Sequence, residues 1–109
     1  MSARYAVRPK ADQDLEDQAY YLATAASPDI GHRFLVAAHE TFALLATQPE
    51  MGWHSRLTDP ALGSMRVFRV SGFKRTLVLY RPRPDGVEIL RVVGGSRNLE
   101  ALLRREGLE

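Results

Sequence analysis

Arginine and lysine side chains are concentrated between residues 64 and 98 of this chain. The stretch holds two acidic residues, Asp85 and Glu88, and eight basic ones, which are Arg66, Arg69, Lys74, Arg75, Arg81, Arg83, Arg91 and Arg97. Thirteen of the fifteen basic residues in the chain are arginine, whose guanidinium group binds carboxylate or phosphate through paired hydrogen bonds. A coding bias toward arginine would give the same composition. Interpreted as a functional feature, the stretch predicts a negatively charged partner, either nucleic acid or an acidic protein segment.

Residue types that carry catalysis are sparse in the sequence. His32 and His39 are seven residues apart, but no Asp, Glu or His stands three or four residues further to complete a metal site. No serine lies in a nucleophile motif, Gly94-Gly95 lacks the remaining glycines of a phosphate-binding loop, and there is no cysteine. We therefore predict no catalytic residue, no metal and no cofactor, and interpret both histidines as surface residues.

Cleavage of RNA without a metal would need an acid or a base beside cations that stabilise the developing charge. The cations are plentiful, but candidate acids and bases are few. Tyr80 falls at a core position, and no histidine follows His54. This distribution weakens a ribonuclease interpretation.

Composition and charge indicate the class of protein. The chain has 109 residues, of which 45% are hydrophobic and 26% charged, as is typical of a soluble globular domain, and we predict a single domain over residues 1–109. Residues 1–60 carry five basic and eight acidic side chains, whereas residues 61–109 carry ten and five. No apolar signal region precedes the first strand pattern and no run approaches a membrane span, so we expect a cytoplasmic protein.

Hydrophobic periodicity predicts the elements that position the basic residues. Alternation indicates strands over residues 4–8, 65–70, 75–81 and 86–93; helical periodicity indicates two helices over residues 10–26 and 28–48, and a short one over 97–105. Ser27, Pro28 and Asp29 are typical of a helix start, and the carboxylates within residues 12–17 complement a helix dipole. The order β-α-α-β-β-β(-α) predicts an α+β domain with an antiparallel sheet packed on an α-helical hairpin.

Both faces of the predicted sheet carry apolar side chains. We expect one face to hold Met65, Val67, Val78, Tyr80, Leu90 and Val92, and the other to hold Phe68, Val70, Leu77, Leu79, Val87, Ile89 and Val93. One helical hairpin covers a single face. The other face is therefore expected to be an apolar groove, filled by a partner protein or by the C-terminal tail, and fringed by Arg66, Arg75, Arg81 or Arg91. Residues 49–63 are expected to form a loop that holds Trp53 and His54. Trp53 is interpreted as an anchor of this loop that packs on the helices, with a stacking platform as the alternative.

The ordered set of elements resembles the RelE/ParE superfamily of toxins from bacterial type II toxin–antitoxin systems. The matching stretches cover essentially the full chain and are Arg8–Ala11 through Asp14-Leu15, Pro49–Gly52, Met65–Val70, Leu79–Arg81 and Ile89–Leu99. Within the superfamily the chain is more similar to the ParE branch. RelE-like ribosome-dependent mRNA endoribonucleases carry an arginine where this chain has Leu77 and a tyrosine near the position of Leu103, while their arginine after the last strand is kept as Arg97.

The ParE resemblance implies a non-enzymatic inhibitor of DNA gyrase that traps cleaved DNA complexes. It also implies a cognate antitoxin, a small acidic protein whose C-terminal segment folds on the toxin and whose separate DNA-binding part represses the operon. Operator DNA is then contacted only through the antitoxin. We predict that the partner-binding residues are Arg66, Arg69, Lys74, Arg75 and Arg97. Two alternatives stay open: a RelE-like ribosome-dependent ribonuclease, and a non-toxic antitoxin-binding or co-repressor module.

Overall fold

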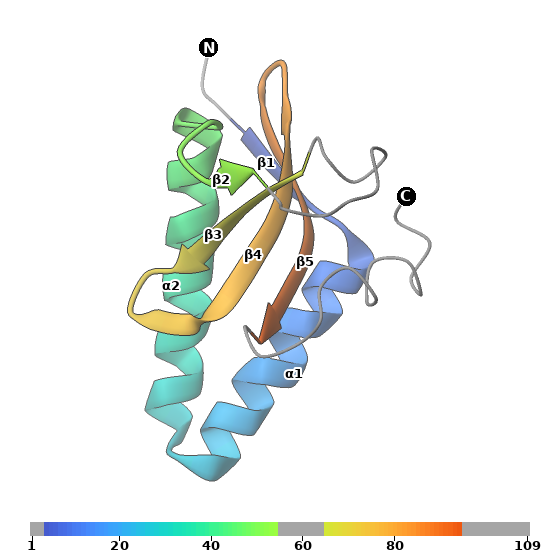
Figure 1. Ribbon diagram of the computed structural model, residues 1–109. Helices are drawn as coiled ribbons and strands as arrows, with labels where there is room; N and C mark the ends of the chain where they lie inside the picture. Colours follow the sequence, from blue (N-terminus) through green and yellow to red (C-terminus); the bar gives the residue numbers. More distant parts are fainter. Residues whose placement is uncertain (1–3, 55–64, 95–109) are drawn as a thin grey trace.

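The computed structural model describes residues 4–54 and 65–94, which form two helices packed on a five-stranded sheet (Figure 1). In chain order the elements are β1 (Arg4–Val7), α1 (Pro9–Ala25), α2 (Pro28–Thr47), β2 (Trp53–His54), β3 (Arg66–Val70), β4 (Phe73–Arg83) and β5 (Gly86–Gly94). The strands lie in the order β1-β5-β4-β3-β2. The predicted α+β fold is confirmed, with one correction: the sheet is mixed, because β1 is parallel to β5. The helix expected over residues 97–105 lies outside the described residues.

The second helix begins at the predicted residue, Pro28, and the first begins one residue before its predicted start. Pro9 opens α1, and Ser27 caps α2 by accepting a hydrogen bond from the Ile30 N–H on its Oγ at 3.3 Å. The two helices pack closely at Gly31, where a Cβ atom would lie 2.7 Å from the Ala19 carbonyl oxygen. Neither helix is long and apolar enough to cross a membrane, and these are the helices that the described residues form.

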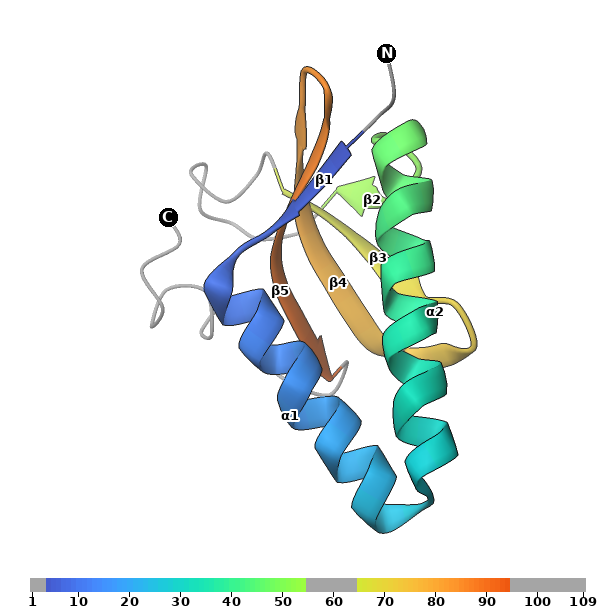
Figure 2. The same ribbon diagram turned by 180° about the vertical axis from the view of Figure 1, so that it is seen from behind.

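The main core lies between the helices and one face of the sheet, as the two opposite views show (Figures 1 and 2). Leu15, Phe34 and Phe42 from the helices are at most 1% exposed. From the sheet this core receives Val70, Val78, Tyr80, Val87, Ile89 and Val92. Full burial of each large apolar side chain contributes about 1.5–3 kcal/mol, so this layer holds the helical hairpin on the sheet.

A second apolar cluster lies on the face of the sheet that is turned away from the helices. It consists of Met65, Val67, Leu79, Leu90 and Val93, with Leu77 packed against it. These five side chains are at most 3% exposed, so this face is not the open apolar groove that a partner protein was expected to fill. The other alternative, cover by the C-terminal tail, falls on residues outside the described ranges. At this cluster, no exposed apolar groove is available to a partner.

The expected division of side chains between the two faces is also partly wrong. The β4–β5 ladder shifts its register between Leu79 and Tyr80. As a result, Val92 lies in the main core with Val87 and Ile89, whereas Leu90 and Val93 lie in the second cluster. Strict alternation fails wherever a bulge adds a residue, because every later side chain then changes face.

Two details of the strands differ from the sequence prediction. β2 was expected to be loop, and it pairs with β3 through Trp53 opposite Val67 and His54 opposite Arg66. β4 begins at Phe73 instead of Arg75, so the turn after β3 contains only Ser71 and Gly72. Gly72 has a φ of 79°, a backbone conformation that suits glycine in a tight turn.

Candidate partner-binding surface

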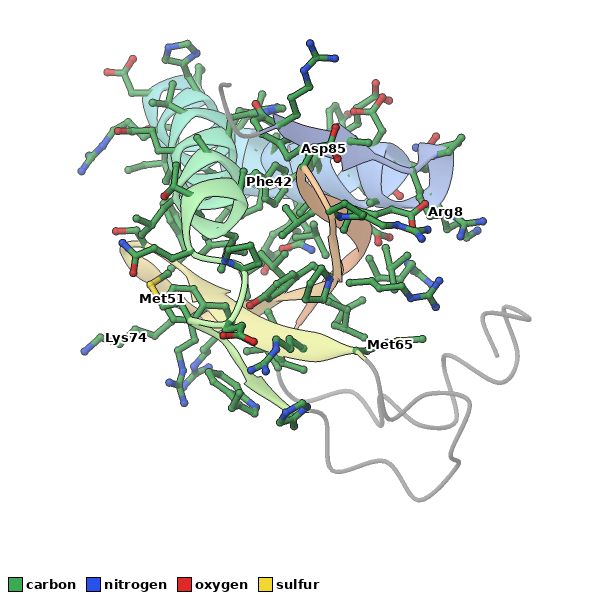
Figure 3. All side chains as sticks on the ribbon, turned by 90° about the horizontal axis from the view of Figure 1, so that it is seen from above. Arg8, Phe42, Met51, Met65, Lys74 and Asp85 are labelled. Carbon is green, nitrogen blue, oxygen red and sulfur yellow. The ribbon has the colours of Figure 1, made fainter. Side chains whose placement is uncertain are left out.

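The end of the sheet built by β2, β3 and the start of β4 carries the basic residues that the sequence singles out. Arg69, Lys74 and Arg75 are exposed, and Arg66 is half-buried. Lys74 points away from the body of the molecule in the view down onto the fold (Figure 3). Arg97 lies outside the described residues. We call Trp53, Arg69, Lys74 and Arg75 the basic edge.

No carboxylate neutralises the basic edge within the part of the chain that the structure describes. Residues 51–54 and 65–84 contain six Arg or Lys residues and no Asp or Glu. The ion pairs formed by described residues lie elsewhere: Arg83 contacts Glu88 at 2.5 Å, and Arg91 contacts Asp14 at 2.7 Å. The edge therefore presents a positive potential that favours an anionic partner.

Trp53 lies within this surface and is not a loop anchor on the helices. Its side chain is 41% exposed. The Arg69 guanidinium lies over the indole, 5.2 Å from the ring centroid, and the Phe68 ring is 6.4 Å away between centroids. An arginine held over an indole forms a cation–π contact, so an aromatic plane and a cation are presented together.

Arg66 has a structural role that the sequence does not reveal. Its Nη1 donates hydrogen bonds to the carbonyl oxygens of Gly52 at 2.7 Å and Glu50 at 3.2 Å. Its Nη2 lies 3.2 Å from His54 Nε2. Because arginine has no acceptor, Arg66 is the donor in any hydrogen bond between these two groups. Arg66 thus fixes the backbone leading into β2, and less of its charge is free for a partner.

Tyr80 holds the same segment from the core side, and its predicted core position is confirmed. The side chain is fully buried. Its hydroxyl donates to the Pro49 carbonyl at 2.8 Å and accepts from the Gly52 N–H at 2.9 Å. Burial raises the pKa of the Tyr80 hydroxyl, against the lowering effect of the Gly52 hydrogen bond and of the Arg66 charge. Both hydroxyl contacts are structural, so Tyr80 is not placed to exchange protons with a substrate.

Gly52 is required for this arrangement. A Cβ atom at that position would lie 2.6 Å from the Tyr80 hydroxyl oxygen and 2.7 Å from the Val67 carbonyl oxygen. The Pro49–Gly52 stretch, noted in the sequence only for its resemblance to other chains, is therefore the segment that places β2 and Trp53 at the edge of the sheet.

Arg91 does not fringe a groove as expected. It is 4% exposed, and its Nε and Nη2 bind the Asp14 carboxylate at 2.7 and 2.9 Å. Asp14 Oδ2 also accepts a hydrogen bond from the Val92 N–H at 3.0 Å. The carboxylates of residues 12–17 are therefore not all explained by the helix dipole, because Asp14 joins α1 to β5.

The histidines and carboxylates of the described residues form no cluster of three that could hold a metal ion. His32 and His39 are both exposed, which agrees with their interpretation as surface residues. His39 Nδ1 lies 3.0 Å from the Tyr5 hydroxyl. The structure also places the His54 imidazole at this cationic surface. The sequence analysis expected His54 only to lie in a loop.

One of the comparisons with known proteins identifies a family, and a second identifies a similar fold. A family model described as the ParE toxin of the type II toxin–antitoxin system parDE matches residues 5–99. A solved structure titled "Chromosomal ParDE TA system from P. aeruginosa" has a similar fold, with a TM-score of 0.68 and 15% sequence identity over 85% of this chain and 96% of that chain. At this identity the structural match shows a shared fold. No curated protein sequence matches the chain.

Proposed function

This chain belongs to the ParE toxin family of type II toxin–antitoxin systems, and we propose that it inhibits DNA gyrase and is neutralised by a cognate antitoxin. The observation that carries the proposal is the match of the family model to residues 5–99. The arrangement of two helices on a five-stranded sheet supports it, because a ParDE structure has a similar fold. Gyrase acts on DNA in the cytoplasm, which is where we expect the toxin to act.

We propose that the chain acts by binding gyrase and not as an enzyme. Two observations support this view over the ribonuclease alternative. Tyr80 is buried with its hydroxyl committed to two backbone groups, and Leu77 stands where RelE-like enzymes carry an arginine. His54 is the remaining acid–base candidate among the described residues of the cationic surface, so a ribonuclease of this structure would depend on it.

We propose that the antitoxin presents acidic side chains to the basic edge. The buried second cluster gives no support to an apolar groove for the antitoxin. The exposed cations Arg69, Lys74 and Arg75 do support an acidic partner, because no described carboxylate pairs with them. Arg66 and Arg97 complete the set of proposed partner contacts. Operator DNA would be reached only through the antitoxin.

Induction of the chain in bacteria without its antitoxin separates the three functions. Filamentation with a DNA-damage response supports gyrase inhibition, and co-expression of the antitoxin should restore growth. Codon-linked mRNA cleavage that is lost in His54→Ala would contradict the proposal in favour of the ribonuclease. Normal growth at a verified level of folded protein would contradict it in favour of the non-toxic module.

A further inference from the structure

We propose that the basic edge binds a single strand of nucleic acid directly, with phosphate groups on Arg69, Lys74 and Arg75 and a base against the Trp53 indole. This site goes beyond the proposed action on gyrase and does not depend on it. The proposal rests on an exposed aromatic ring, on cations without described counter-charges, and on the way that β2 and β3 place them together.

The exposed indole is the feature that points to a base. Trp53 is 41% exposed, although it is among the largest apolar side chains of the described residues. The Arg69 guanidinium over its ring, at 5.2 Å from the centroid, adds a second planar group. Proteins bind single strands by stacking bases on such aromatic and guanidinium planes next to cations that contact the backbone.

The cations extend from this ring along the sheet. Trp53 pairs with Val67 at one end of β3, and Lys74 and Arg75 follow the turn at its other end. At about 3.3 Å per residue, the distance from Val67 to the turn is roughly 13 Å. Arg69 lies between the two ends. A single strand of nucleic acid that lies along β3 would therefore have positive side chains close to several of its successive phosphate groups.

In the toxin without its antitoxin, the indole favours a nucleic acid strand over an acidic polypeptide as the occupant of the basic edge. Both partners would be attracted by the cations, but an acidic segment that folds on a protein usually places apolar anchors in a groove. The apolar side chains of the neighbouring cluster are buried. A single strand, unlike a duplex, has unpaired bases that can stack on the indole. An antitoxin that covered the same cations would displace the strand.

Trp53 is the only tryptophan in the chain, so its fluorescence reports on this site alone. The purified full-length chain is titrated with a short oligothymidine strand at increasing salt. We expect saturable quenching, with an affinity that falls roughly 20-fold between about 50 and 200 mM salt if about three phosphates are neutralised. Absence of quenching, or quenching that does not depend on salt, would overturn the proposal.

Matched variants separate a site from general charge attraction. In fluorescence anisotropy with a labelled strand, we expect Arg69→Ala/Lys74→Ala/Arg75→Ala to abolish binding. Arg4→Ala/Arg8→Ala/Arg33→Ala removes the same charge from exposed positions outside the basic edge and should retain most of the affinity. We expect Trp53→Ala to weaken binding about 10-fold.

Equal loss in both triple variants, unchanged affinity in Trp53→Ala, or tighter binding of polyglutamate than of the oligonucleotide would each overturn the proposal. Tighter binding of duplex than of single-stranded DNA would also overturn it. Circular dichroism of each variant checks the fold. Because gyrase is absent from the assay, the result is independent of whether the chain inhibits that enzyme.

Discussion

Single residues in this structure have roles that their types alone do not reveal. Tyr80 and Arg66 both bind the backbone of the segment before β2, and Asp14 joins α1 to β5 through Arg91 and the Val92 N–H. Each of these contacts joins residues that are distant in the sequence. Local patterns such as helix caps and charge runs give no signal for such pairs, which is why the sequence placed Tyr80 in the core but did not predict what its hydroxyl binds.

Replacement of Tyr80 by Phe should lower the free energy of unfolding by about 1–3 kcal/mol, because a buried N–H and a buried carbonyl lose their partner. Urea unfolding measures this loss, and Tyr20→Phe is the control, since Tyr20 is 73% exposed. The raised pKa of Tyr80 means that its neutral form is favoured in the folded state. Its stabilising contribution is therefore complete below the ordinary tyrosine pKa of 10.0 and is lost as the pH rises above that value.

The alkaline loss of stability should accordingly be larger in the wild type than in Tyr80→Phe. Parallel urea titrations of the two proteins at several pH values measure the difference. The other ionisable groups are the same in both proteins, so their contributions to the pH dependence cancel in the comparison. An identical pH dependence in both proteins would contradict the role assigned to the hydroxyl.

Replacement of Asp14 by Asn should destabilise the chain by about 3 kcal/mol, because it removes the carboxylate that faces a buried guanidinium. Asp12→Asn is the matched control: Asp12 is exposed in the first turn of α1, and its loss should cost less than about 1 kcal/mol. Thermal and urea unfolding compare the two. A smaller effect at position 14 than at position 12 would show that the pair contributes little.

At the scale of elements, the sequence predicts those helices and strands whose formation depends on local signals. Both helices are confirmed because proline, a serine cap and apolar periodicity act within a few residues. β2 was missed because a two-residue strand has no periodicity and forms only by pairing with β3. The faces of β5 were partly misassigned because the register shift opposite Tyr80 is a property of the strand pair. The basic residues were predicted from composition, whereas the exposed Trp53 beside Arg69 depends on β2.

The close contact between α1 and α2 leads to a prediction about stability at this scale. Alanine at Gly31 should destabilise the chain by about 1–3 kcal/mol, since the new Cβ would approach the Ala19 carbonyl to 2.7 Å and force the helices apart. This loss would occur although alanine favours a helix by about 1 kcal/mol over glycine. Gly94→Ala is the control, because nothing lies within 4 Å of its added Cβ. Equal unfolding midpoints for the two variants would contradict the close packing.

At the scale of the whole molecule, one end of the sheet presents a group of exposed cations that have no ion-pair partner among the described residues. Residues 1–60 supply eight of the thirteen acidic residues, and one of them, Asp14, forms an internal ion pair with Arg91. Basic side chains on β3 and β4 are left without described carboxylate partners. This distribution supports our proposals that the basic edge binds an acidic antitoxin and, in the absence of antitoxin, a nucleic acid strand. The proposed partner site is therefore an exposed cationic surface and not the open apolar groove expected from the sequence.

The double replacement Arg75→Ala/Arg97→Ala should reduce toxicity while the protein stays folded, because it removes two of the proposed partner contacts. Growth after induction measures toxicity, and circular dichroism measures folding. Arg8→Ala/Arg33→Ala removes equal charge from exposed positions outside the basic edge and should leave growth arrest unchanged. Full arrest by the Arg75/Arg97 variant would refute the contact assignment.

The most direct test of gyrase inhibition uses purified components. DNA gyrase is assayed for supercoiling of relaxed plasmid with increasing amounts of the full-length chain, with and without its antitoxin. We predict that supercoiling falls, that cleaved plasmid accumulates, and that stoichiometric antitoxin reverses both effects. Unchanged supercoiling and no cleaved plasmid at saturating amounts of folded chain would contradict the proposed function.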